Sequence, residues 1–167
     1  MKTRQQLLET WCRSVSIMHI AHHVAAAYYT KWHLWLGASA TILAAIVGAS
    51  IFATLTRFAA DAGPIATVGV GLVSMLSAAL TGAVAFLELD ERARRHTKAA
   101  ANFQGLRREA EEELVKLAEN GSSQDYRSFQ TRWCEIIKEA PPLPQSIHDR
   151  VKRDMDAKHR EDSKTTP

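Results

Sequence analysis

Charged residues divide the chain into an apolar centre and two polar flanks. The 56 residues from 32 to 87 carry two charges, Arg57 and Asp61, whereas the other 111 residues carry 37. On either side of this pair lie uncharged runs, 23 residues at 34–56 and 26 residues at 62–87. At about 1.5 Å per residue, the shorter run makes a helix of roughly 34 Å, which is long enough for the hydrocarbon core of a bilayer. The pattern predicts two membrane spans, at about 34–56 and 64–87.

A buried hairpin in a soluble protein is the alternative interpretation of these runs. A surface helix of a soluble domain needs a polar face, and neither run has one. Both helices would then have to be enclosed on all sides, and the rest of the chain is too short and too polar to enclose them. We therefore expect the hairpin to lie in lipid.

The residues between the two runs predict the tip of the hairpin. Gly63 and Pro64 interrupt the helix after Asp61, since proline is best tolerated in the first turn of a helix. Arg57 and Asp61 would reach water at the interface. Within about 20 residues of the spans, six basic residues lie on the terminal sides and only Arg57 lies in the loop, so the positive-inside rule predicts a multi-pass protein of the inner membrane with both termini in the cytoplasm.

The flanks of the spans predict helices that continue into the cytoplasm, at about 4–31 and 88–119. Apolar residues and histidines recur there at spacings of three and four, which is typical of one packing stripe on each helix. The stripes include His22 and Tyr29 on the first helix and His96 and Phe103 on the second. We expect the two stripes to pack on each other.

The C-terminal part of the chain predicts smaller helical elements. A third helix is expected at about 123–139, after the Asn-Gly stop that ends the second flanking helix and before the Pro-Pro-Leu-Pro segment. A short helix and a flexible tail follow in 146–167, so we divide the chain into 1–145 and 146–167. The predicted fold class is an all-α membrane protein: a two-helix transmembrane hairpin with long cytoplasmic helical extensions and a small C-terminal helical element.

Small residues at four-residue spacing follow both spans. Such residues allow helices to approach closely in lipid, where no hydrophobic force drives helices together. Two interpretations are open. The rows of small residues pack the two helices of one chain together, or they also contact neighbouring subunits and so form a homo-oligomer. The candidate packing residues are Gly37, Ala45, Gly48, Ala49, Ser74, Ala78 and Gly82.

Little in the sequence points to catalysis, a cofactor or nucleic acid. Residues 88–167 hold sixteen basic and sixteen acidic side chains, without the basic face that nucleic acid requires. No nucleophile stands at a recognisable spacing from a base, and no phosphate-binding glycine loop is present, so we expect neither an enzyme nor a cofactor. His19, His22 and His23 share a helix face, but without other ligand types nearby we assign them a structural role rather than a metal site.

The middle of each predicted span lacks ionisable residues. Coupled transporters and proton relays usually place such residues at membrane depth, so this class is disfavoured. A passive pore remains compatible with the sequence, because an oligomer can line a path with small polar residues and backbone groups.

The chain resembles the SLATT domain, a two-transmembrane effector domain associated with SMODS and SLOG proteins in bacterial conflict systems. The resemblance covers residues 4 to about 145. It rests on helix and membrane patterns rather than on a catalytic signature: AHHVAAAYYTKWHLWLG before and into the first span, ILAAIVGASIF within it, RARRHTKAAANFQGLRREAEEEL after the second span, and the closing PPLP.

The resemblance implies a membrane effector of an anti-phage system. Such an effector is proposed to oligomerise and to permeabilise the inner membrane after a nucleotide-derived signal, so that an infected cell dies before phage spreads. No sensor domain is visible in this chain, so a nucleotidyltransferase or a nucleotide-sensing partner would supply the signal, or the cytoplasmic helices would sense it themselves. The alternative functions are a non-conducting membrane anchor or scaffold that recruits a cytoplasmic partner, and a soluble helical interaction domain.

Overall fold

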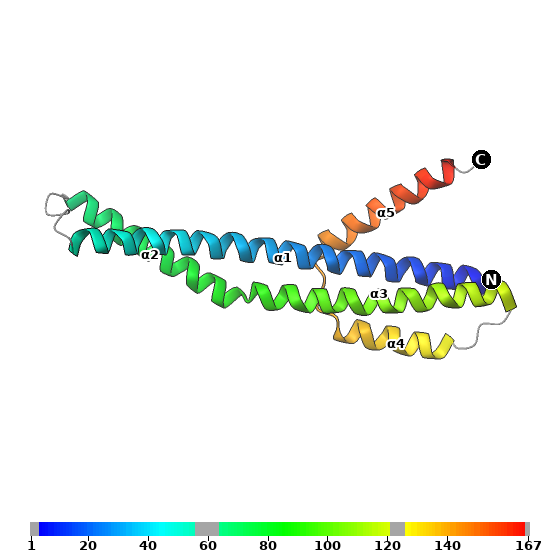
Figure 1. Ribbon diagram of the computed structural model, residues 1–167. Helices are drawn as coiled ribbons and strands as arrows, with labels where there is room; N and C mark the ends of the chain where they lie inside the picture. Colours follow the sequence, from blue (N-terminus) through cyan, green and yellow to red (C-terminus); the bar gives the residue numbers. More distant parts are fainter. Residues whose placement is uncertain (1–3, 56–63, 121–125, 166–167) are drawn as a thin grey trace. The chain divides into compact units, whose positions relative to one another are not determined.

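The protein is built from α-helices throughout the part that the computed structural model describes, residues 4–55, 64–120 and 126–165. This confirms the predicted all-helical class (Figure 1). Five helices follow one another along the chain: α1 (Arg4–Leu55), α2 (Pro64–Leu87), α3 (Leu89–Asn120), α4 (Tyr126–Glu139) and α5 (Gln145–Thr165).

The chain separates into two compact units. Met1–Tyr28 together with Arg92–Pro167 form one, here called the bundle unit, and Tyr29–Glu91 form the other, here called the hairpin unit. The boundary predicted at residue 145 falls inside the bundle unit. There, Val151 of α5 packs in one apolar cluster with Ile17 and Ala21 of α1.

Helix α1 is a single helix of 52 residues and contributes to both units. Its range covers the predicted flanking helix and nearly all of the first predicted span. The sequence from Arg4 to Leu55 contains no proline, so no backbone amide is missing from its hydrogen-bond ladder. The expectation that this flank continues into the span agrees with the observed helix.

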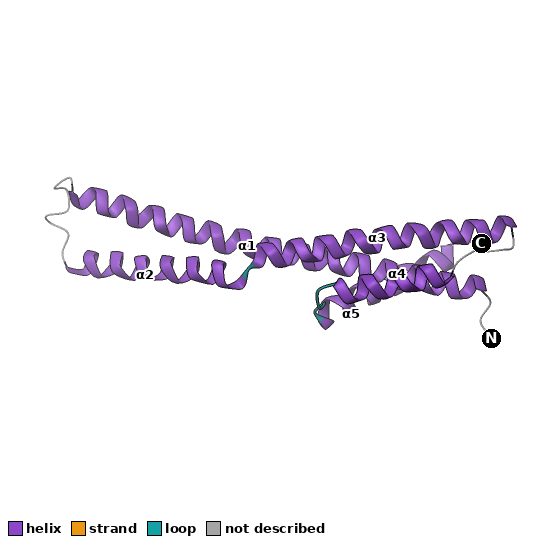
Figure 2. Ribbon diagram, turned by 90° about the horizontal axis from the view of Figure 1, so that it is seen from below, coloured by secondary structure: helices purple, strands orange, loops and turns teal. Residues whose placement is uncertain are grey.

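The corresponding expectation for the second span is wrong. Helix α2 ends at Leu87 and α3 begins at Leu89, with Glu88 between them at a φ of 45°. Figure 2 draws this break as a short loop between the two helices. Left-handed backbone costs an L-residue about 1–2 kcal/mol, and glycine usually occupies such a position after a helix. Because glutamate stands there instead, the break could not be predicted from the residue at this position.

The bundle unit has an apolar core to which α1, α3 and α4 contribute. Val15 of α1, Phe103 and Leu106 of α3, and Phe129 of α4 are buried together. Trp11 stacks on Phe129, with ring centroids 5.4 Å apart. An ion pair between Arg132 of α4 and Glu109 of α3 lies at the surface. Each of these helices therefore buries one stripe and exposes the remaining faces.

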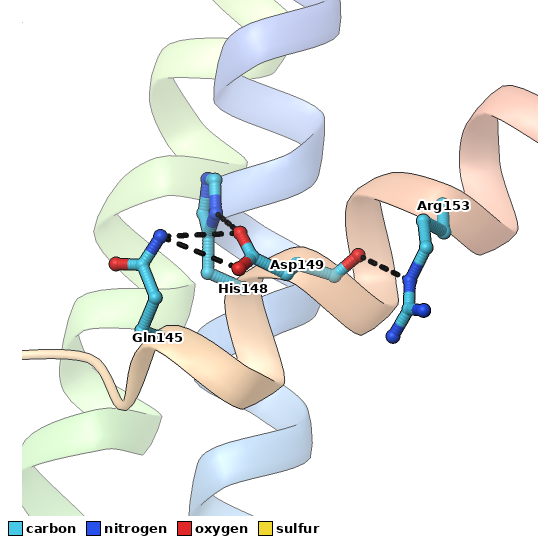
Figure 3. A network of polar contacts seen from close by, with 4 residues as sticks. All are labelled: Gln145, His148, Asp149 and Arg153. Carbon is cyan, nitrogen blue, oxygen red and sulfur yellow. Dashed lines mark hydrogen bonds and ion pairs between the residues drawn. The ribbon is translucent and has the colours of Figure 1, made fainter.

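Helix α5 begins directly after the proline segment. The amides of Ile147 and His148 both donate to the carbonyl oxygen of Pro144 and so begin the helix. Figure 3 shows the exposed polar network of its first turns, in which the Asp149 carboxylate accepts from Gln145 at 3.2 Å and contacts His148 at 3.1 Å. The His148 contact lowers the pKa of Asp149. Arg153 donates to the Asp149 carbonyl oxygen at 3.3 Å.

Candidate functional site

The hairpin unit carries large apolar side chains on its surface. Trp35 is 65% exposed, Met75 74% and Phe86 86%. Two helical segments, Gln5–Ala49 and Val68–Glu119, are each long and apolar enough to cross a membrane, and only 6% of the apolar window in each is buried. A core helix of a soluble protein is mostly buried. Apolar surface of this extent on a single chain marks a site for lipid or for another protein.

Helices α1 and α2 meet inside the hairpin unit through small residues. Ala40 and Ser77 are buried, and the Ser77 hydroxyl donates to the carbonyl oxygen of Ala40 at 3.3 Å. A buried hydroxyl needs such a partner, because an unpaired polar group away from water is costly. The contact between the two helices is therefore made at Ala40 and Ser77.

The predicted packing residues lie elsewhere on the two helices. A Cβ atom built at Gly37, Gly48 or Gly82 would meet no other atom within 4 Å, apart from its own helix backbone and immediate neighbours. Four further candidates have exposed side chains: Ala45, Ala49, Ser74 and Ala78. These faces are not filled by the other helix of the same chain, so they are available to another molecule.

The predicted hairpin tip falls mostly outside the described residues. Arg57, Asp61 and Gly63 are not described, and Pro64 is the first residue of α2. Proline at this position fits its preference for the first turn of a helix, where its missing amide hydrogen has no partner to lose.

The bundle unit contains a buried trio of ring side chains, His22, His96 and Phe103. They are 1%, 3% and 0% exposed. The Nδ1 atoms of His22 and His96 lie 2.9 Å apart, within hydrogen-bonding distance. The ring of His22 stacks on the ring of Phe103 at a centroid distance of 5.4 Å. The trio links α1 to α3 through residues 74 positions apart in the sequence. Three of the four residues predicted to pack in the flanking helices thus come together.

The hydrogen bond between the two imidazoles restricts their tautomers. One Nδ1 must carry the hydrogen and the other must accept it. Nε2 of His22 is buried and has no hydrogen-bond partner among the described residues. A buried lone pair is tolerated better than a buried unpaired N–H. This favours His22 as the donor through Nδ1–H and His96 as the acceptor.

Burial keeps both imidazoles neutral. Loss of solvation, together with the smaller effect of the nearby His96, lowers the pKa of His22 to about 4. Burial likewise lowers the pKa of His96. A proton on either ring would place an uncompensated charge in the core, so acid should weaken the contact between α1 and α3.

The remaining predicted residues do not join this trio. Tyr29 is half-buried and belongs to the hairpin unit. His19 contacts the carbonyl oxygen of Ala100 through Nδ1 at 2.9 Å, and His23 is exposed. The rings of His19 and His23 lie edge to face at a centroid distance of 6.4 Å, whereas His22 faces His96. Within the described ranges, no group of three or more His, Cys, Asp or Glu side chains is arranged to hold a metal ion.

Two features of the bundle unit were missed at the level of sequence. One is the pairing of His22 with His96, since helical spacing identifies the packing face of a helix but not the residue opposite. The other is the aromatic group of Trp11, Phe129 and Trp133, in which the two tryptophan centroids lie 6.4 Å apart. The aromatic residues at positions 129 and 133 of α4 are four apart, which is the signal that could have indicated this face.

Comparisons of the chain with protein-family models, with curated proteins and with solved structures found no match. The resemblance of the sequence to the SLATT domain therefore stays a prediction, and a function has to be argued from the residues of this chain.

Proposed function

We propose that the protein is a two-span effector of the inner membrane, which assembles through its hairpin unit and makes the bilayer leaky. In this proposal α2 and the second half of α1 lie in lipid, and both termini lie in the cytoplasm. The observation that carries the proposal is the exposed apolar surface of the hairpin unit, which water cannot favourably cover.

The outward small residues support assembly between chains. A Cβ atom built at Gly48 or Gly82 would meet nothing within 4 Å, apart from its own helix backbone and immediate neighbours, although small residues in spans usually mark a close helix contact. A second copy of the hairpin would supply that contact. Several copies arranged in this way could enclose a path lined by Ser, Thr and Gly, without an ionisable group at membrane depth.

The bundle unit supports a role in receiving a signal. It is a packed helical unit with its own core, and its helix α1 continues without a break into the hairpin unit. A change in the packing of α1 against α3 could thus be passed along one rigid helix. The resemblance to the SLATT domain supports an anti-phage setting, in which a nucleotidyltransferase or nucleotide-sensing partner supplies the signal.

Release of a self-quenched dye from liposomes tests this function. We expect the reconstituted full chain to release dye, with a steep dependence on the ratio of protein to lipid because a pore needs several chains. A matched sample should contain the same amount of a single-span peptide of similar hydrophobicity. Protein that inserts and assembles yet releases no dye would contradict the effector function and favour the non-conducting anchor or scaffold.

Growth of cells that overproduce the protein gives a second readout. Growth arrest that is lost when the spans are disturbed, but kept when α4 and α5 are removed, supports permeabilisation. Arrest that depends on α4 and α5 instead supports recruitment of a cytoplasmic partner.

A further inference from the structure

A groove in the bundle unit runs between α3 and the end of α4. Its cavity volume is about 440 Å³. One wall comes from the first turns of α3, and the other from the last turn of α4 and the prolines that follow it. All of its lining residues belong to the bundle unit.

The α3 wall is a row of hydrogen-bond donors. Arg95, Lys98 and Asn102 are spaced by three and four residues, so they share one face of the helix, and all three line the groove. Neither Lys98 nor Asn102 has a hydrogen-bond or ion-pair partner within the described ranges. The groove therefore offers the Lys98 cation and the Asn102 amide, with the Arg95 cation beside them, to a ligand with several acceptor oxygens.

The opposite wall is mostly apolar. Ile136, Ala140, Pro141 and Pro142 line it, and Ala99 of α3 adds to the same surface. A small, fully hydrated anion gains nothing from such a wall. A molecule that joins an anionic head to an apolar stem would use both sides of the groove.

The donors follow the second apolar helix closely in the chain. Arg92, Arg94, Arg95 and Lys98 all lie within eleven residues of Leu87, the last residue of α2. Clusters of four or more basic residues directly beside a span are typical of sites that attract anionic lipids.

We propose that this groove binds the phosphate headgroup of an anionic phospholipid. Arg95, Lys98 and Asn102 hold the phosphate oxygens, and the glycerol and the first acyl carbons lie against Ile136 and the prolines. The inference rests on the proposed membrane function. Glu139, which also lines the groove, and the C-terminal end of the α4 dipole oppose the anion and limit its affinity.

Native mass spectrometry of the full chain in detergent tests the proposal. The probe is an equimolar mixture of phosphatidylglycerol and phosphatidylcholine, and we expect the protein to retain phosphatidylglycerol preferentially. The double variant Arg95→Gln/Lys98→Gln should bind it about thirtyfold more weakly, since each juxtamembrane cation contributes about fivefold. The charge-conserving variant Arg95→Lys/Lys98→Arg should keep most of the binding.

A matched control removes the same charge elsewhere. Arg150 and Lys152 are exposed on α5 and do not line the groove. Arg150→Gln/Lys152→Gln should leave phosphatidylglycerol retention unchanged. Glu139→Gln should increase retention severalfold, because it removes the opposing charge without changing the shape of the side chain.

Three results would overturn the proposal: equal retention of both lipids, equal losses in the two double variants, or binding of soluble glycerol phosphate as tight as that of the lipid. Each can be distinguished from failure of the proposed function. A protein that resists alkaline extraction from membranes but shows no lipid preference lacks only this site. A protein that is stripped from membranes lacks the spans, whatever it binds in detergent.

Discussion

The bundle unit and the hairpin unit use the same secondary structure but place their apolar side chains in opposite ways. In the bundle unit, Phe103 and Leu106 are fully buried, and charged residues cover the surface. In the hairpin unit, Trp35 and Phe86 are among the most exposed large hydrophobic side chains of the described residues, and the buried contact is made by Ala40 and Ser77. Helix formation is thus common to both units, while the solvent that each requires is different.

The comparison also shows that each unit is stabilised in its own way. The bundle unit removes large side chains from water and gains hydrophobic free energy. The hairpin unit has little such gain within one chain, so under the proposed function its helices are stabilised by lipid and by close backbone approach. Substitutions of the same kind should therefore have different consequences in the two units.

The largest effect is expected at the centre of the bundle unit. Phe103→Ala removes a fully buried ring that contacts His22, and should lower the free energy of unfolding of this unit by about 3–5 kcal/mol. Urea unfolding of the detergent-solubilised chain, followed by the fluorescence of Trp11 and Trp133, measures it. Val115→Ala is the control, since Val115 is exposed on the same helix and its loss should cost less than about 0.5 kcal/mol. Equal losses would show that the bundle core is not where the structure puts it.

Introducing an arginine at an exposed position should affect membrane insertion in the hairpin unit but not in the bundle unit. Ala44 of the hairpin unit and Ala101 of the bundle unit are both exposed alanines within helices. Ala44→Arg should disfavour insertion by roughly 2.5–3.5 kcal/mol, because arginine then lies near the centre of a span. Ala101→Arg should have no effect, because it faces water. Flotation of membranes on a sucrose gradient measures the inserted fraction. If both variants float like the parent chain, position 44 does not lie in lipid.

Acid should destabilise the bundle unit through the histidine pair. The pKa of His22 is lowered to about 4 in the folded chain and is about 6.5 when unfolded, so the unfolded state binds the proton first. The stability from this group is complete above pH 6.5 and declines as the pH falls toward 4, by about 3 kcal/mol in total. Urea unfolding between pH 7.5 and 4 measures this decline.

Carboxylates also titrate in acid, so variants are needed to isolate the histidines. The double variant His22→Leu/His96→Leu should show a smaller decline with acid, because it has no buried imidazole to protonate. His23→Leu, which changes an exposed neighbour, should keep the full decline. An unchanged decline in the double variant would mean that the pair does not cause it.

Association between hairpins should depend on the outward small residues. Gly48→Leu and Gly82→Leu each add a side chain where the single chain has open space, so the fold of one hairpin is not disturbed. If these faces meet between chains, association should weaken by about 1–3 kcal/mol, the usual cost of overpacking. Analytical ultracentrifugation in detergent measures it. Gly69→Leu is matched in size and setting but lies off the Ser74, Ala78 and Gly82 row. Unchanged oligomer size in both test variants would place the contact elsewhere.

The smallest effect is expected at the break between α2 and α3. Glu88→Gly should stabilise the chain by about 1 kcal/mol, because glycine adopts a positive φ without strain. Glu112→Gly in the interior of α3 should have the opposite sign and a similar size. Thermal unfolding followed by circular dichroism compares them. A loss of stability in Glu88→Gly would argue against the left-handed conformation.

The elements of the fold could be predicted from sequence because length and periodicity report on single helices. The uncharged runs predicted the apolar helices. The spacing of His22, His96 and Phe103 predicted the packing faces of the flanking helices. Contacts between helices were not predictable in this way. The His22–His96 bond and the packing of Val151 on Ile17 depend on which faces meet, and one sequence carries no record of that. The break at Glu88 lacked the glycine or proline that usually marks such a position.

The candidate site was predictable to a similar depth. Small residues in the spans could be listed from their spacing, but the sequence left open whether they face the same chain or another one. In the structure, Ala40 and Ser77 make the buried contact between α1 and α2. Gly48 and Gly82 lie on faces of these helices that the other helix of the chain does not cover. The groove lined by Arg95, Lys98 and Asn102 could not be predicted either. Basic residues directly after a span are already explained by the positive-inside rule, so they do not indicate a binding site.

Extraction of cell membranes with alkaline carbonate tests the central claim, that the hairpin unit lies within the bilayer. The full chain should stay in the membrane pellet at high pH, together with a known integral protein, while a peripheral marker is released into the supernatant. Recovery of the chain in the supernatant with the peripheral marker would contradict the account.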